Sequence, residues 1–234
     1  MAIATRSDLA PLFESAWSGF TTAWQQSQTA QAIALTVGGN VMRLLFANAV
    51  IPPLFLPALA HLVHPGQEAA LEIAIWDSAS TGVAMLPPPW AEDDYRARGE
   101  IRGVDADAAV QVAYHPGSGI LSLLHRDERR AVLWMADAKQ CPSYEWAAPL
   151  RTILHWWCTA QGQQLVHGAA VGTADGAVLI TGKGGSGKST TALSALLAGM
   201  FYLGDDYVLC EFSAGMAQVF SVFNSDKVDR NTLQ

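Results

Sequence analysis

The chain has 234 residues, of which half are apolar and 15% are charged, and its formal net charge is −7. This length suits one large domain or two small ones. The apolar content is enough for a sizeable core, with apolar surface left for a homo-oligomer or another partner. A net negative charge without any run of lysine or arginine argues against nucleic acid as a partner.

The cysteines and the N-terminal segment suggest a cytoplasmic protein. Cys141, Cys158 and Cys210 lie far apart and show no metal-binding or redox spacing, which suits a reducing compartment. No long apolar stretch follows the first basic residue, so we predict no signal peptide. Residues 41–63 are apolar but include Arg43 and a proline pair. A strand, a turn and a short helix explain them better than a membrane span, which needs about 20 residues with few or no charges.

The first part of the chain is predicted to form a small antiparallel sheet with a few helices. Residues 7–28 carry apolar side chains at three- and four-residue spacing, which predicts a helix packed on its own domain. Apolar runs between turn residues predict hairpin strands at 32–37 and 41–46, a short helix at 54–62, strands at 71–76 and 82–86, hairpin strands at 111–114 and 120–124, and a strand at 131–135.

Near residue 145 the pattern changes to that of an α/β unit. The predicted order is a helix at 147–160, strands at 164–171 and 177–181, a glycine-rich loop, a helix at 188–198, and strands at 201–203, 207–212 and 218–223. We therefore divide the chain into an N-terminal helix (1–30), an N-terminal α+β domain (31–145) and a nucleotide-binding domain (146–234).

The glycine-rich loop carries the clearest chemical signal. Residues 182–189, GKGGSGKS, match the pattern G-x-x-x-x-G-K-[ST] in full, between an apolar strand and an amphipathic helix. Glycines reach backbone angles that a Cβ forbids, and they let amide groups surround an anion. The helix that opens at Gly187 adds free N–H groups. Lys188 is expected to bridge the β- and γ-phosphates and Ser189 to bind Mg²⁺. The loop therefore predicts a nucleoside triphosphate site, and a glycine-rich turn with a chance lysine is the weaker explanation.

Two further features follow or precede this loop. Asp205 and Asp206 come directly after a short strand, where paired carboxylates can hold Mg²⁺ and take a proton from a hydroxyl. A solvated turn is the alternative, and the position after a phosphate loop favours function. His167 lies on the predicted strand 164–171, which pairs in sequence with the strand that leads into the loop, and by itself a histidine beside apolar residues is more often a core residue. Glu145, Arg151, His155 and Asp77 are interpreted as surface charge or helix packing, and His115 shows no ligand spacing.

At these residues the chain resembles a known family. The run LVHGAAVGTADGAVLITGKGGSGKSTTALSALLAGMFYLGDDYVLCE is similar to the nucleotide-binding core of HPr kinase/phosphorylase-like serine kinases. In that family a His-Gly strand, a phosphate loop ending in Gly-Lys-Ser and an Asp-Asp pair follow in this order. ATP-dependent phosphoenolpyruvate carboxykinase is more distantly similar, through the histidine, the loop and a Gly-Asp-Asp. The resemblance covers residues 164–212.

The resemblance implies a role for each matching residue. The residues that would hold the phosphates of ATP are Gly182, Lys183, Gly184, Gly185, Ser186, Gly187, Lys188, Ser189 and Thr190. Ser189 and Asp206 would hold Mg²⁺, and Asp205 would be the base toward a serine hydroxyl, although the two aspartates could exchange roles. His167 would lie near the metal or the γ-phosphate as a catalytic residue together with Lys188, which overturns its interpretation as a core residue.

The chain also departs from that family. Thr190 stands where HPr kinases usually carry an acidic residue, and the first 140 residues do not look like their N-terminal domain. The kinase domain of the family continues well beyond the position of Gln234, so we expect the kinase core to be incomplete here.

We therefore expect an α/β protein in which a small N-terminal α+β domain precedes a P-loop kinase core of the HPr kinase and carboxykinase type. The expected activity is ATP-dependent phosphoryl transfer to a serine hydroxyl of a protein or peptide substrate, with ATP and Mg²⁺ as cofactors. Two alternatives belong to other classes: a non-catalytic nucleotide-binding or regulatory module, and a carboxykinase-like enzyme on a small acid.

Overall fold

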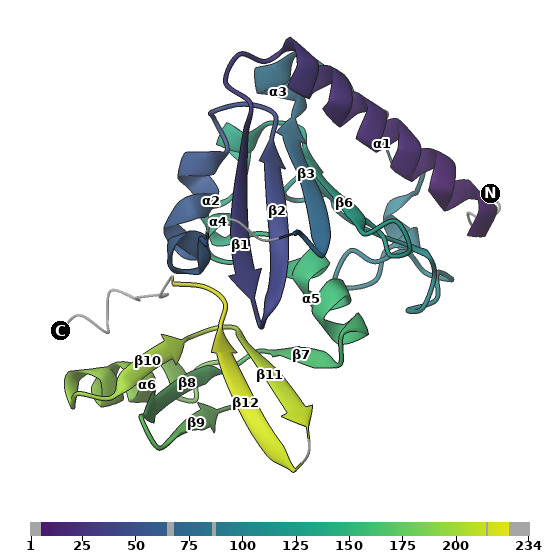
Figure 1. Cartoon of the computed structure of the whole chain (residues 1–234). Helices are drawn as coiled ribbons and strands as arrows, with labels where there is room; N and C mark the ends of the chain where they lie inside the picture. The colour runs from purple at the N-terminus through teal and green to yellow at the C-terminus, as the bar shows by residue number, and fades with distance from the viewer. Residues whose placement is uncertain (1–5, 65–67, 86–87, 214, 225–234) are drawn as a thin grey trace.

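The computed structural model describes residues 6–64, 68–85, 88–213 and 215–224. Figure 1 shows the larger sheet in the upper half of the molecule, flanked by helices, and two smaller sheets below it. The helices are α1 (Arg6–Gln26), α2 (Pro52–Leu59), α3 (Ser78–Thr81), α4 (Ser143–Ala147), α5 (Arg151–Ala160) and α6 (Lys188–Leu197). Short 3₁₀ turns are η1 (Ala60–Leu62), η2 (Glu92–Asp94) and η3 (Ala138–Gln140).

The strands fall into three sheets. The strands of the larger sheet are β1 (Gln31–Val37), β2 (Asn40–Phe46), β3 (Leu71–Asp77), β4 (Val110–His115), β5 (Ile120–His125) and β6 (Arg130–Met135). The strands of the smaller sheets are β7 (Gln163–Val166), β8 (Ala169–Thr173), β9 (Gly176–Ile180), β10 (Phe201–Gly204), β11 (Val208–Ser213) and β12 (Met216–Ser221). The protein is thus mixed α/β, with parallel and antiparallel strands.

The larger sheet has the order β1-β2-β3-β6-β5-β4 and is mixed, which corrects the expectation of an antiparallel sheet. Both predicted hairpins form, but β3 pairs in parallel with β2 and with β6. Parallel neighbours need a long crossover. The segment between β2 and β3 supplies one, because it includes α2 and η1.

The strand predicted at 82–86 is wrong for the described residues 82–85, which have no regular structure, and Leu86 lies outside the described residues. The chain turns earlier, because the buried Asp77 caps helix α3 by accepting the N–H of Ser80 at 3.1 Å. Asn48 Nδ2 also donates to this carboxylate at 3.2 Å. Asp77 is therefore a buried structural cap, and its local hydrogen bonds compete successfully with extended backbone.

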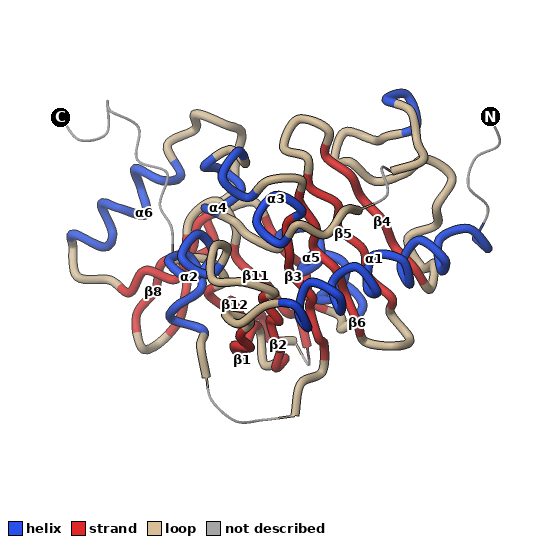
Figure 2. The backbone as a smooth tube through the Cα atoms, turned by 90° about the horizontal axis from the view of Figure 1, so that it is seen from above, coloured by secondary structure: helices blue, strands red, loops and turns tan. Residues whose placement is uncertain are grey.

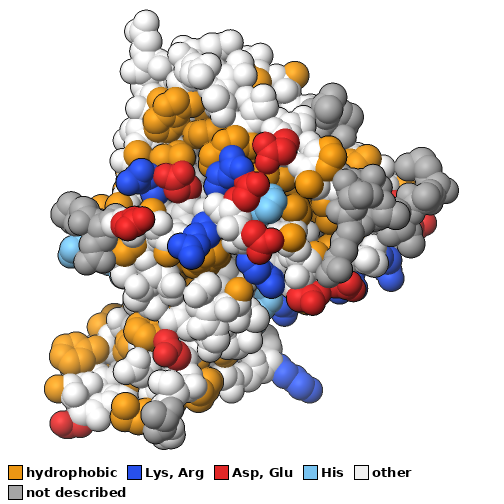
Figure 3. All heavy atoms as spheres, turned by 45° about the vertical axis from the view of Figure 1, so that its right-hand side comes forward, with side chains coloured by type: hydrophobic (Ala, Val, Ile, Leu, Met, Phe, Trp, Pro, Cys, Tyr) orange, Lys and Arg blue, Asp and Glu red, His pale blue; other side chains and the backbone are white. Residues whose placement is uncertain are grey.

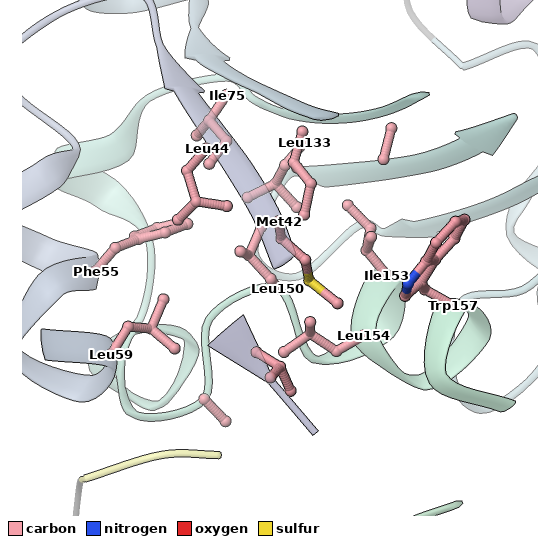
Figure 4. Packing of buried hydrophobic residues seen from close by; sticks show 14 of the residues in the cluster. Met42, Leu44, Phe55, Leu59, Ile75, Leu133, Leu150, Ile153, Leu154 and Trp157 are labelled. Atoms are coloured by element: carbon pink, nitrogen blue, oxygen red, sulfur yellow. The ribbon is translucent and has the colours of Figure 1, made fainter. Parts of the chain in front are cut away.

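Helices cover both faces of the larger sheet. Along β3, Ile73 and Ile75 point into one hydrophobic cluster, while Ala74 and Trp76 point into another. Helix α1 packs on the second face, as predicted (Figure 1). A strand that is buried on both faces reads as a continuous apolar run, which is why 71–76 shows no alternation. On the first face, side chains of β2, β3, β6, α2 and α5 point toward one another (Figure 4).

The predicted strand at 164–171 is split into two by His167 and Gly168, and each half joins a different sheet. β7 pairs with β11, whereas β8 lies between β10 and β9. A Cβ at Gly168 would lie 2.8 Å from the carbonyl oxygen of Ile180, so any larger residue here would force the backbone to shift. Helix α6 packs against β8 and β10, and Figure 2 shows it at the opposite end of the molecule from α1.

The two parts share a core. Leu165 of β7, Leu209 of β11 and Phe223 belong to the same buried cluster as α5 and the larger sheet. Residues 41–63 form β2, α2 and η1, as predicted. Within the described ranges, no helix is long and apolar enough to cross a membrane.

Candidate functional site

Strand pairing brings the three predicted features to one edge of a sheet. β9 and β10 both run antiparallel to β8, with Ile180 opposite Ala169 and Gly204 opposite Ala170. The carboxyl ends of β9 and β10 therefore lie at the amino end of β8. The glycine-rich loop follows β9, the two aspartates follow β10, and His167 precedes β8.

The loop between β9 and α6 holds a buried lysine. Gly185 and Gly187 have φ values of 75° and 87°, which a residue with a Cβ rarely adopts. Lys188 is only 9% exposed, and its Nζ donates to the carbonyl oxygens of Gly182 at 3.1 Å and Lys183 at 3.2 Å. The ammonium group is thus held inside the loop by two neutral acceptors. A phosphate oxygen would be a stronger, charged acceptor for the same group.

The start of α6 adds a second preference for negative charge. Its N-cap is Gly187, and no side chain caps the free N–H groups of the first turn. These groups carry the positive end of the helix dipole. Ser189, which is partly buried, and Thr190, which is exposed, lie in that first turn. The loop and the helix together can hold an anion with several charges.

The two aspartates differ in their surroundings. Asp205 is 3% exposed, and within the described residues its carboxylate has neither a hydrogen bond nor an ion pair. The Tyr207 N–H bonds to the Asp205 carbonyl oxygen at 2.8 Å, which closes a three-residue turn around Asp206 at φ 67°. A turn of this type at a non-glycine residue is rare and strained, and such strain concentrates at functional positions.

His167 faces this turn and not the core. Its side chain is 54% exposed, and its Nε2 lies 2.9 Å from Oδ1 of Asp206. The ring stacks on Tyr207, with centroids 5.3 Å apart and an interplanar angle of 26°. The Gly168 N–H also donates to the Asp206 carbonyl oxygen at 3.2 Å. The interpretation of His167 as a core residue, which the residues alone favoured, is therefore wrong.

The residues at this edge fit a divalent cation bound together with phosphates. In the part of the chain that the structure describes, no three His, Cys, Asp or Glu side chains are grouped as metal ligands. Mg²⁺ does not need such a group, because it keeps several waters and commonly takes only one or two carboxylates beside substrate phosphates. Asp205 and Asp206 offer two carboxylates at this edge. Ser189 and Asp206 stay the predicted ligands.

A pocket of about 440 Å³ opens beside His167 and Tyr207. Glu145, Arg151 and His155, which we interpreted as surface charge or helix packing, line this pocket together with His115. No spacing in the sequence relates them to one another, since they come together only when the turn after β4 and helices α4 and α5 meet. Tyr207 could have been found from the sequence, because it directly follows the two predicted aspartates.

The cysteines are not candidates for covalent chemistry. All three are free and buried. Burial raises the pKa of Cys158 to about 12 and that of Cys141 to about 11. A thiol with such a pKa stays protonated at neutral pH, whereas the nucleophile is the thiolate.

A scan against protein-family models finds no match for this chain, and a search of curated proteins finds none either.

On the face shown in Figure 3, lysine and arginine side chains lie interspersed with aspartate and glutamate, and no continuous basic patch is visible.

Proposed function

We propose that the protein transfers the γ-phosphoryl group of ATP to a serine hydroxyl of a protein or peptide, with a kinase core of the HPr kinase type. One observation carries the proposal. The loop with Lys188, the Asp205–Asp206 turn and His167 meet at a single sheet edge, although they are separated in the chain. The resemblance over residues 164–212 supports the same function, because it involves these three features.

ATP is held by the loop and the start of α6. The backbone N–H groups of residues 182–190 surround the phosphates, and Lys188 exchanges its two carbonyl acceptors for phosphate oxygens. Mg²⁺ bound to Ser189 and Asp206 would neutralise charge on the phosphates. The 2.9 Å contact with His167 Nε2 supports this role of Asp206, since carboxylates that bind metals are usually fixed by an outer hydrogen bond.

The phosphoryl transfer itself needs a base and an aligned hydroxyl. The serine oxygen forms a bond to the γ-phosphorus, and the bond from that phosphorus to the β–γ bridging oxygen breaks to release ADP. Asp205 accepts the hydroxyl proton. Its carboxylate suits this role, because it is buried at the same edge and is not committed to another side chain in the described residues.

Phosphoryl transfer from γ-labelled ATP to a library of serine peptides tests this proposal. Asp205→Asn is expected to lower turnover by roughly 10²–10⁴-fold, the usual contribution of a positioned base, while ATP binding persists. Asp175→Asn is the matched control, because Asp175 is exposed in the turn at the opposite end of β8 and β9. That variant is expected to keep full turnover.

Other outcomes would point to other functions. Nucleotide binding without transfer to any serine peptide would contradict a kinase and favour a nucleotide-binding module. Turnover that depends on oxaloacetate would favour a carboxykinase-like enzyme.

A further inference from the structure

The pocket beside His167 is built from parts of the chain that are distant in sequence. Its walls come from the segment 97–100, the turn 115–118 between β4 and β5, and helices α4 and α5, and it reaches His167 and Tyr207. Its volume of about 440 Å³ lies within the range of pockets that bind small molecules. The pocket therefore joins the larger sheet to the proposed site of phosphoryl transfer.

A chain of contacts links one arginine of this pocket to that site. The guanidinium carbon of Arg151 lies 5.5 Å from the ring centroid of Tyr207, and the Tyr207 ring stacks on His167. His167 in turn pairs with Asp206. A cation–π contact orients a guanidinium group without neutralising its charge. Arg151 forms no ion pair with the described residues, so its five donors stay available to a ligand.

The other charged or titratable groups that line the pocket are less available to an anionic ligand or do not contact His167 and Tyr207. Burial lowers the pKa of His115 and that of His155 below the ordinary value of 6.5, which favours the neutral rings at pH 7. Glu100 accepts a hydrogen bond from the Trp156 indole at 3.2 Å. Glu145 makes no hydrogen bond or ion pair with His167 or Tyr207 in the described part of the chain. Arg98 lies exposed at the rim, so Arg151 is the charged lining group whose contacts lead to His167.

We propose that this pocket binds the phosphoryl acceptor, and that the acceptor is a peptide segment in which an acidic residue lies next to the serine. Arg151 binds the acidic side chain, and the serine then lies toward His167 and Asp205. A guanidinium fork matches a carboxylate with two parallel hydrogen bonds, so it selects an acidic over an amide side chain. The inference rests on the proposed function, since it names the substrate of the same site.

Fluorescence anisotropy with two labelled, end-blocked hexapeptides tests this inference. One peptide carries a single serine flanked by glutamates, and the other carries glutamines in their place. We expect the full chain to bind the acidic peptide about tenfold more tightly without nucleotide. Arg151→Gln should remove this preference. The matched variant Arg102→Gln, at an exposed arginine outside the pocket, should keep it.

Two further variants keep the test decisive. Arg151→Lys retains the charge but not the fork, and should retain only part of the preference. If Arg151→Gln does not fold, Arg98→Gln at the exposed rim should reduce the preference by a smaller factor.

Three results would overturn the inference. They are equal binding of both peptides to the unaltered chain, an unchanged preference in folded Arg151→Gln, and displacement of the peptide by ADP. The assay needs no phosphoryl transfer, so its failure is distinct from a failure of kinase activity.

Discussion

Strand β3 inside the larger sheet and strand β9 at the edge of the site-bearing sheet differ sharply in burial, whereas β8, between β9 and β10, is buried at four of its five residues. In β3, six of seven residues are buried, with helices on both faces. In β9, which leads into the glycine-rich loop, no residue is fully buried, and Val178 is 57% exposed. The comparison indicates that the larger sheet supplies most of the hydrophobic stabilisation, while the smaller one presents loops and strand ends to solvent and ligands.

Helix α5 connects these two regions. Ile153, Leu154 and Trp157 are buried in the core of the larger sheet (Figure 4). Arg151 and His155, on the same helix, line the pocket beside His167. The larger sheet thus positions one wall of the candidate site.

The largest expected effect tests whether stability resides in the larger sheet. Phe46 is fully buried in β2, where it meets Phe55 edge to face. Phe46→Ala should lower the free energy of unfolding by about 3–5 kcal/mol, because it removes apolar contacts and leaves a cavity. Phe201→Ala is the same change in β10 of the site-bearing sheet, at a residue that is 63% exposed, and should cost less than about 0.5 kcal/mol. Chemical denaturation measures the free energy of unfolding of both variants. Equal losses in the two would contradict the claim that the larger sheet supplies most of the hydrophobic stabilisation.

A smaller effect is expected where the two small sheets separate. A Cβ at Gly168 would meet the Ile180 carbonyl oxygen at 2.8 Å, so Gly168→Ala should force a local shift that costs about 1–3 kcal/mol. Gly176→Ala is the control, because nothing lies within 4 Å of its added Cβ. That variant should be neutral or slightly stabilising. Thermal unfolding distinguishes the two variants. An unchanged melting temperature of Gly168→Ala would contradict the close approach of the Ile180 carbonyl oxygen at this point.

The smallest expected effect is on the dependence of stability on pH. Burial lowers the pKa of His115 and His155 below their ordinary value of 6.5, and Arg151 and Arg98 respectively add to this effect. Above pH 6.5 both rings are neutral in the folded and the unfolded chain, so this contribution to stability is complete. As the pH falls, the unfolded chain binds protons first, and the contribution is lost as the pH passes through the lowered pKa values.

The melting temperature measured from pH 7.5 down to pH 5 tests this sign. His115→Gln should flatten the acid side of the curve, whereas His64→Gln, at an exposed histidine outside the pocket, should not. A curve whose acid side is unchanged in His115→Gln would contradict the role of its burial.

Much of the fold was predictable where local signals act alone. Helix α1, the hairpin β1–β2 and the loop before α6 follow from periodicity and glycine placement, and all lie where predicted. The parallel pairing of β3 was not predictable, because a strand buried on both faces carries no sign of its neighbours. The cap at Asp77 was missed, since an Asp-Ser segment suits a turn and a short helix equally.

The candidate site likewise has parts that the sequence predicts and parts that it does not. The Lys188 loop and the Asp205–Asp206 pair are contiguous motifs, so the sequence alone indicated them. Arg151, Tyr207 and the pocket they line depend on long-range packing, which no short pattern records.

Calorimetric titration of ATP with Mg²⁺ tests the central claim, that the loop after β9 holds the nucleotide. We predict one site in the unaltered chain. In Lys188→Ala, which loses the buried ammonium group, we predict a loss of roughly 10–100-fold in affinity. Lys139→Ala is the matched control, because Lys139 is an exposed lysine in η3 and has no part in the proposed nucleotide site, so this variant should bind ATP as the unaltered chain does. No binding in the unaltered chain, or equal binding by Lys188→Ala, would contradict the account.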